Sequence, residues 1–130
     1  MKEKKPRLNA AIPESLSSAI DKNMIEEGYS KRKKSKWVEE ALKELLASIN
    51  NNEDKKKQLK YSKKVETASQ IYGNTKIISI YIKAQLKHEL ACAILIVRKY
   101  YPGLELVKSL IIKASIVNRL FTYDKLKKNI

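Results

Sequence analysis

The sequence predicts a mainly α-helical fold with a short two-stranded antiparallel β-ribbon, on the strength of three observations. The 130 residues include only 3 glycines and 3 prolines, too few for a turn-rich all-β protein. Two stretches, residues 7–12 and 77–82, alternate with the period of a strand. Each stretch is followed at once by two helical patterns. The order strand, helix, helix therefore occurs twice, and such internal repetition is a strong indication of the fold.

The first copy is predicted over residues 5–46. Its strand has apolar side chains on one face and Arg7, Asn9 and Ala11 on the other. Pro13 ends the strand and suits the first turn of a helix, whereas the glycine of "EEGYS" suits the end of that helix. A basic loop and a second amphipathic helix, "SKWVEEALKELLASI", complete the copy,.

Residues 47–74 are polar, rich in Asn and Lys, and without period. They predict a linker that forms helix only transiently in its middle. The second copy follows over residues 75–120, where "KIISIYIKAQL" repeats the opening pattern and "YYPG" separates two helices. Residues 121–130 form a tail. The offset between copies grows by three residues from strand to second helix, so the first helix should be about one turn longer in the second copy.

The two strands are expected to pair with each other, because an isolated short strand leaves its backbone groups unpaired and one copy cannot bury its helix faces. Pairing can occur within one chain or between two chains. Within the ribbon, four apolar side chains should pack on the four helices: Leu8, Ala10, Ile78 and Ile80.

Charge and cysteine content restrict the function. Lys and Arg number 28 against 14 Asp and Glu, a formal net charge of +14, which favours a polyanionic partner over a merely solubilising basic surface. Cys92 is the single cysteine, so neither an internal disulfide nor a cysteine-based zinc site can form. The N-terminus lacks the apolar stretch of a secretory signal, and "LACAILIV" is too short to cross a bilayer. These features predict a cytoplasmic protein.

The order of elements resembles the ribbon-helix-helix family, the group of Arc, MetJ and CopG. The motifs "LNAAIPESL", "EEGYS" and "KSKWVEEALKEL" carry the resemblance in the first copy, and "IISIYIKAQL" and "VKSLIIKAS" carry it in the second. The resemblance implies that two copies intertwine, that their ribbon enters the DNA major groove, and that each second helix holds a phosphate at its N-terminus. One chain with two copies is similar to the tandem pseudo-dimeric type found among TraY-like plasmid-transfer accessory proteins.

The resemblance places the outward side chains of both strands against base edges. Arg7 suits guanine, Asn9 suits adenine, and Ala11 can contact a thymine methyl group. On the second strand Ser79 can bond to several bases, whereas Ile77 and Tyr81 are unusual readers. They either contact thymine methyls and sugars, which predicts an asymmetric rather than palindromic DNA site, or pack against the linker or another subunit.

A phosphate clamp is expected at the start of each second helix, since free N–H groups and the helix dipole attract anions there. In the first copy its residues are Lys31, Arg32, Lys33, Lys34, Ser35 and Lys36. The counterpart in the second copy, Lys108 with Ser109, is thinner. A solvated basic loop or a localisation-type patch is the alternative.

Enzymatic features are weak. His88 lies off the apolar stripe of its helix, Cys92 lies among apolar neighbours, and Glu39, Glu40 and Glu44 suit an exposed helix face; Trp37 fits a core position better than base stacking. The sequence predicts no catalytic residues, metal or other cofactor.

Sequence-specific binding of double-stranded DNA is the leading hypothesis, in transcriptional regulation or as an accessory factor for plasmid DNA transfer or partition. Self-association on DNA is a further expectation. The alternative is a protein-interaction module, such as an antitoxin or adaptor, that uses the linker and the tail "YDKLKKNI" and binds DNA secondarily. Membrane-surface binding is disfavoured, because the polar helix faces also carry acids.

Overall fold

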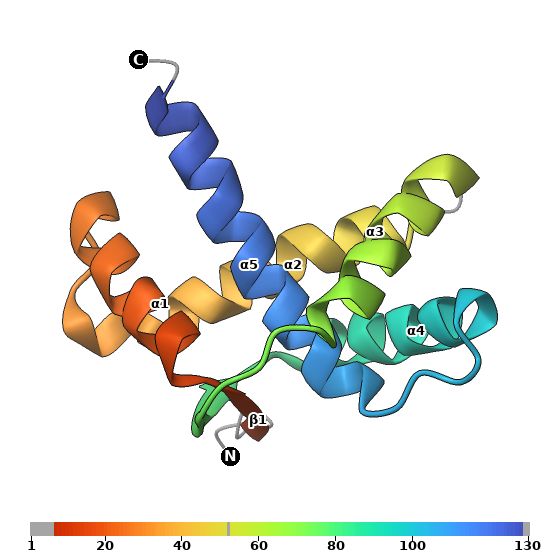
Figure 1. The fold of residues 1–130 in the computed structure, drawn as a ribbon, viewed down its shortest axis with the longest axis horizontal. Coiled ribbons are helices and arrows are strands. Elements are labelled where there is room, and N and C mark those ends of the chain that lie inside the picture. The colour runs from red at the N-terminus through yellow and green to blue at the C-terminus, as the bar shows by residue number, and fades with distance from the viewer. Residues whose placement is uncertain (1–6, 52, 129–130) are drawn as a thin grey trace.

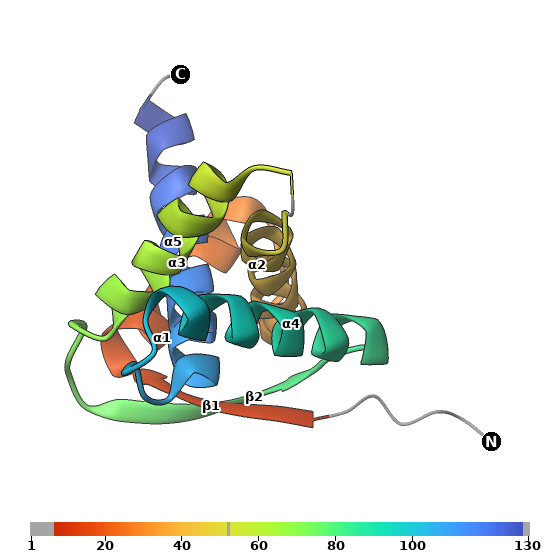
Figure 2. The same ribbon diagram turned by 90° about the vertical axis from the view of Figure 1, so that its right-hand side faces the viewer.

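The computed structural model describes residues 7–51 and 53–128, apart from the side chains of residue 31 and residues 124–128. The described chain is mainly helical, with one two-stranded antiparallel sheet. The ribbon forms a layer of its own, and all the helices lie on one side of it (Figure 2). In chain order the elements are β1 (Arg7–Pro13), α1 (Glu14–Glu27), the 3-10 turn η1 (Lys31–Lys33), α2 (Lys34–Ile49), α3 (Lys55–Ala68), β2 (Thr75–Tyr81), α4 (Ala84–Tyr100) and α5 (Val107–Lys128) (Figure 1).

The ribbon pairs β1 with β2 in antiparallel register, with Ala10 opposite Ile78 at its centre and Asn9 opposite Ser79 beside them. Alternate side chains point toward the helices and are buried, as the period of a strand requires. The four side chains expected to pack inward are all buried, between 1% and 8% exposed: Leu8, Ala10, Ile78 and Ile80. Ile12 and Ile82 are also buried at the ends of the two strands. The predicted pairing of the two distant strands is confirmed.

The turn after α1 forms as the sequence predicts. Gly28 adopts a left-handed conformation with φ of 85°, which glycine reaches without steric cost. Its N–H donates to the carbonyl of Ile25, and the Tyr29 N–H donates to the carbonyl of Met24 at 2.8 Å. This pattern is a Schellman motif. It ends α1 and turns the chain toward η1.

The core lies between the ribbon and the second helix of each half. Helix α2 packs against α5, α1 contacts α5, and α4 contacts α2. Each strand likewise contacts the second helix of the other half, because β1 contacts α5 and β2 contacts α2. Trp37 is fully buried in this core, which confirms its assignment as a packing residue. Helix α4, at 17 residues, is three residues longer than the 14-residue α1, close to the one-turn difference predicted.

Residues 47–74 differ from the prediction of an aperiodic linker. Helix α2 continues to Ile49, and α3 occupies the middle of this stretch as a docked helix that contacts α5, α2 and α4. Asp54 caps α3 by accepting a hydrogen bond from the Lys57 N–H at 3.1 Å. Its buried face contains Gln58, Ser62, Val65 and Ala68. The spacing is helical, but half of these residues are polar, so hydrophobic periodicity did not show the helix.

The predicted tail is also helical as far as it is described. Helix α5 runs without interruption past residue 120 to Lys128, and residues 129–130 lie outside the described part of the chain. No helix among the described residues has the length and apolar character needed to span a bilayer.

The docking of α3 can be tested at Val65, which is fully buried. Val65→Ala should lower the free energy of unfolding by about 1–2 kcal/mol, because removing methyl groups leaves a cavity in the core. Urea denaturation measures the difference. Leu59→Ala is the matched control, because Leu59 is 48% exposed on the same helix and should change stability by less than about 0.5 kcal/mol. Equal effects of the two substitutions would contradict a docked α3.

Candidate nucleic-acid interface

The outward face of the ribbon brings together all six residues predicted to read bases. Five of them are exposed to solvent and Ser79 is half-buried. Ile77 is 72% and Tyr81 50% exposed, so the alternative that they pack against the linker is wrong for the described chain. Large apolar side chains held open to solvent on a rigid sheet are typical of a surface that meets a partner. The six are Arg7, Asn9 and Ala11 from β1 and Ile77, Ser79 and Tyr81 from β2.

Polar side chains link the two strands across this face. Arg7 donates from Nη2 to the Ser79 hydroxyl at 2.9 Å. That hydroxyl donates in turn to Oδ1 of Asn9 at 2.7 Å. The three side chains thus hold one another in position over the middle of the ribbon. Because a hydroxyl can rotate and re-pair at little cost, Ser79 can release both partners when a ligand offers better hydrogen bonds.

The two ends of the outward face differ in chemistry. Arg7 lies opposite Tyr81 at one end, and Ala11 lies opposite Ile77 toward the other. The first pair offers a guanidinium and a phenol, whereas the second pair is apolar, with the exposed hydroxyl of Thr75 beyond it. A long partner lying along the ribbon would therefore meet two different sets of groups.

Helix α2 begins beside the Tyr81 end of the ribbon. The backbone N–H of Tyr81 donates to the Ser35 hydroxyl at 3.1 Å, which fixes the N-terminus of α2 to the edge of the sheet. An open groove of about 600 Å³ lies at this junction. Cations predominate among its lining side chains, which are Arg32, Lys33, Ser35, Lys36, Glu39, Glu40, Lys43, Tyr81 and Lys83. The predicted clamp and one end of the ribbon thus form a continuous basic surface.

Besides the lining cations, the N-terminus of α2 itself favours the binding of an anion. Its first turn contains no acidic residue, and no side chain caps its N–H groups. Uncapped N–H groups and the positive end of the helix dipole attract negative charge. Cations at this end oppose the dipole, so the isolated protein places like charges together here. A bound anion would relieve that repulsion.

Not every residue of the predicted clamp lines this groove. Lys34 forms an ion pair with Asp21 at 3.0 Å and donates to the Ser17 hydroxyl at 2.7 Å. It therefore joins α2 to α1 instead of facing the groove. The side chain of Lys31 lies outside the described residues. The cations of the predicted run that line the groove are Arg32, Lys33 and Lys36, and Lys36 also lowers the pKa of the Glu40 carboxyl.

The segment predicted as the second clamp contains a single cation. Lys108 is exposed and Ser109 half-buried in the first turn of α5. Glu105 and the 78% exposed Leu106 precede them. These two residues line a smaller hollow with Thr75, at the apolar end of the ribbon. At this place the second half has Glu105 and Leu106, whereas the first half has a run of cations.

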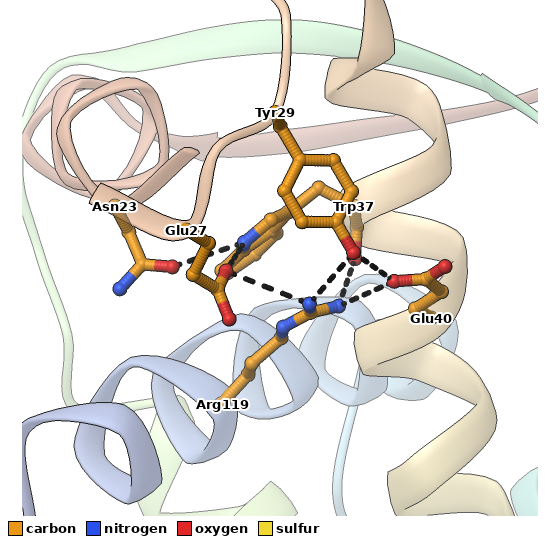
Figure 3. Close-up of polar contacts among 6 residues, drawn as sticks. All are labelled: Asn23, Glu27, Tyr29, Trp37, Glu40 and Arg119. Carbon is orange, nitrogen blue, oxygen red and sulfur yellow. Dashed lines mark hydrogen bonds and ion pairs between the residues drawn. The ribbon is translucent and has the colours of Figure 1, made fainter. Parts of the chain in front are cut away.

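A charged network that sequence reasoning missed braces the first clamp from below. Arg119 of α5 reaches between α1 and α2 and lies 4.7 Å from the centre of the Trp37 ring (Figure 3). Its guanidinium donates to the carbonyl of Trp37 at 3.0 Å and to the Tyr29 hydroxyl at 3.1 Å. It also pairs with Glu27 at 3.5 Å and Glu40 at 3.3 Å. One side chain of the second half thus holds both ends of the loop that carries η1.

The acids of this network are not a simple exposed face. Tyr29 donates a hydrogen bond to Glu40, and this bond, with the nearby Arg119, lowers the pKa of the Glu40 carboxyl despite its partial burial. The same bond raises the pKa of Tyr29. Glu27 accepts from Nε1 of Trp37 at 2.6 Å. The expectation that Glu40 lies on a solvated helix face is therefore wrong, because its partner comes from residue 119, far along the chain.

The groove also contains cations that the sequence did not single out. Lys83 follows β2, and Lys43 lies two turns into α2. Lys83 is recognisable only once the register is known, because only then does the end of β2 meet the start of α2. His88 and Cys92 lie one turn apart on α4, 3.7 Å between Nε2 and Sγ, away from this groove; Cys92 is half-buried.

Comparison with protein-family models, with curated proteins and with solved structures gave no match for this chain. Its interpretation therefore rests on the residues and geometry described above.

Arg119→Met should lower the free energy of unfolding by about 2 kcal/mol, because Glu27, Glu40 and the Trp37 carbonyl lose a partly buried partner. Urea denaturation measures this loss. Arg98→Met, at an exposed site in the last turn of α4, is the control and should change stability by less than about 0.5 kcal/mol. A loss at position 119 no larger than the control would show that the network does not brace the loop.

Proposed function

We propose that this protein binds double-stranded DNA sequence-specifically by inserting the β1–β2 ribbon into the major groove. The observation that carries the proposal is the ribbon itself: six outward side chains on a two-stranded sheet that continues into a basic groove at the start of α2. A two-stranded ribbon fits the major groove, where each base pair presents a distinct pattern of donors and acceptors. The net charge of +14 supplies the attraction to a polyanion,.

A pseudo-dimeric arrangement of two ribbon-helix-helix copies is part of the proposal. Asn9 and Ser79, which lie directly opposite each other in the ribbon, are separated by 70 residues, the same offset that relates the two strand patterns in the sequence. Exchanging the halves therefore maps the ribbon onto itself. The helix contacts obey the same exchange, since α1 contacts α5 as α4 contacts α2. These relations support an intertwined tandem repeat within one chain.

Base reading falls mainly to Arg7 and Asn9. A guanidinium can donate to O6 and N7 of guanine, and a side-chain amide can pair with N6 and N7 of adenine. In the free protein both side chains are engaged through the Ser79 hydroxyl. DNA binding would exchange these internal hydrogen bonds for hydrogen bonds to bases. Only a matching base sequence would compensate for the internal hydrogen bonds that are lost.

Phosphate binding falls to the groove at the start of α2, with Arg32, Lys33 and Lys36 around the uncapped helix end. Lys31, Lys34, Ser35, Lys108 and Ser109 belong to the same predicted set; of these, Ser35 would act by fixing α2 to the ribbon and Lys34 by fixing α2 to α1. Among the described residues, the proposed clamp with several cations lies at the Tyr81 end of the ribbon. The preferred DNA site would therefore be asymmetric, with tighter phosphate contacts on one side.

Such contacts suit either a transcriptional regulator or an accessory factor for plasmid DNA transfer or partition, since both tasks need one protein to mark one DNA sequence. A protein bound to an asymmetric DNA site also has one defined orientation along the DNA. A palindromic site does not define such a direction.

Selection of bound duplexes from a random pool, followed by footprinting, tests the function. One preferred duplex should emerge, and its affinity should fall steeply with salt as roughly 4–8 phosphates are neutralised. The footprint should be unequal about its centre. Failure to protect any duplex at low salt would overturn the proposal.

Two groups of substitutions should have separable effects on DNA binding. Arg7→Ala or Asn9→Ala should reduce discrimination at one base position by about 1–3 kcal/mol while largely preserving the salt dependence. Arg32→Ala with Lys33→Ala should instead weaken binding to all duplexes and flatten the salt dependence. Titrations of matched and mismatched duplexes at several salt concentrations separate the two outcomes. Indistinguishable behaviour would refute the division into readers and clamps.

A further inference from the structure

A second groove lies between α3 and α5, on the helical layer. Its volume is about 360 Å³, within the range of pockets that hold small ligands or the anchoring side chains of a peptide. The two helices diverge from each other toward the side of the molecule away from the ribbon (Figure 1). The groove uses no residue of β1 or β2; its lining is Lys60, Lys63, Lys64, Thr67, Ala68, Ile71, Ala114, Val117 and Asn118.

The walls of this groove are held in place by contacts between its two sides. Lys64 of α3 donates to Oδ1 of Asn118 of α5 at 2.8 Å, and its ammonium lies 4.7 Å from the centre of the Tyr61 ring. Lys113 of α5 donates to the carbonyl of Ile71 at 3.2 Å. Fixed walls lower the entropic cost of binding, because little has to be ordered when a ligand arrives.

The groove combines an apolar floor with a cationic rim. Ala68, Ile71, Ala114 and Val117 supply the floor, and three lysines of α3 supply the rim. No acidic side chain lines it. The described ion pairs of Lys34 and Arg119 do not involve these lysines. Lys60 and Lys63 are exposed, and the Lys60 ammonium lies 5.7 Å from the centre of the Tyr61 ring. Charge complementarity therefore favours an anionic ligand that also has apolar groups.

We propose that the α3–α5 groove docks an acidic segment of a partner protein, whose apolar side chains enter the groove while its carboxylates meet Lys60 and Lys63. This interaction goes beyond DNA binding and does not depend on it.

A peptide fits this surface better than other polyanions. The apolar atoms lie below the lysines, where a single side chain can reach but a flat bilayer cannot. Nucleic acids bind such sites by stacking bases on aromatic rings, and no aromatic side chain lines this groove. The groove contains no residue of the outward face of the ribbon, so a duplex held by that face leaves Lys60 and Lys63 accessible.

The test is a selection of short random peptides by display on the immobilised full-length chain, in excess duplex DNA that occupies the ribbon. The enriched peptides should be net acidic and contain apolar residues. One of them, labelled with a fluorophore, then serves as the probe in anisotropy titrations against the wild-type chain and its variants.

Three variants at exposed positions make the titration specific. Thr67→Trp fills the groove from its rim, and Lys60→Glu with Lys63→Glu reverses the rim charge; each should weaken the probe about tenfold or more. Lys56→Glu with Lys57→Glu is the matched control, because it makes the same charge change on α3 outside the groove and should weaken the probe less than about threefold. Thermal unfolding checks that all three variants fold.

Several results would overturn the proposal: no enriched peptide, enriched peptides without acids, or equal probe affinity for wild type and Thr67→Trp. The proposal also fails if the groove variants, and not the matched control, weaken binding to duplex DNA or to phosphatidylglycerol vesicles while peptide binding is unchanged. DNA selection remains a separate measurement, so failure here leaves the ribbon's function untouched.

Discussion

Pairing of β1 with β2 is the constraint on which the rest of the structure depends. A two-stranded ribbon alone is only marginally stable in water, and it needs helices against one face. Here the apolar face of the ribbon closes the core formed mainly by α2 and α5, so the helices can bury their stripes only when both strands are present. The same pairing fixes which side chains face outward, and therefore which groups are available to a partner.

Both halves have the order strand, helix, helix, but their charged and polar side chains differ. The first half provides the cationic run at the start of α2 and the polar outward side chains of β1. The second half provides Ile77 and Tyr81 on the ribbon and Arg119, which braces the loop of the first half from α5. The basic loop of one half is therefore held in place by a residue of the other. A separated first half would lose both its strand partner and the brace of its basic loop.

The sequence predicts the elements that obey a simple period and misses those whose partners come from elsewhere in the chain. Both strands, their buried faces and the helix stop at Gly28 follow from alternation and turn chemistry, and the structure confirms them. The sequence does not predict helix α3 because Gln58 and Ser62 make up half of its buried face. The Arg119 network is not predicted because its acids, Glu40 and Glu27, lie 79 and 92 residues away, and Glu40 is on a position that resembles a solvated helix face.

Helix α3 also affects the pairing of β1 with β2. A flexible tether would leave its ends free to sample many separations and would impose a loop-closure cost on strand pairing. Fourteen residues wound as a helix span only about 21 Å, and docking on α2, α4 and α5 fixes their direction. Once α3 is docked, β2 begins close to the end of β1, where the Glu14 N–H donates to the carbonyl of Asn74 at 2.7 Å. The connecting segment thus acts as part of the core that presents the ribbon, and its burial stabilises the register on which the outward face depends.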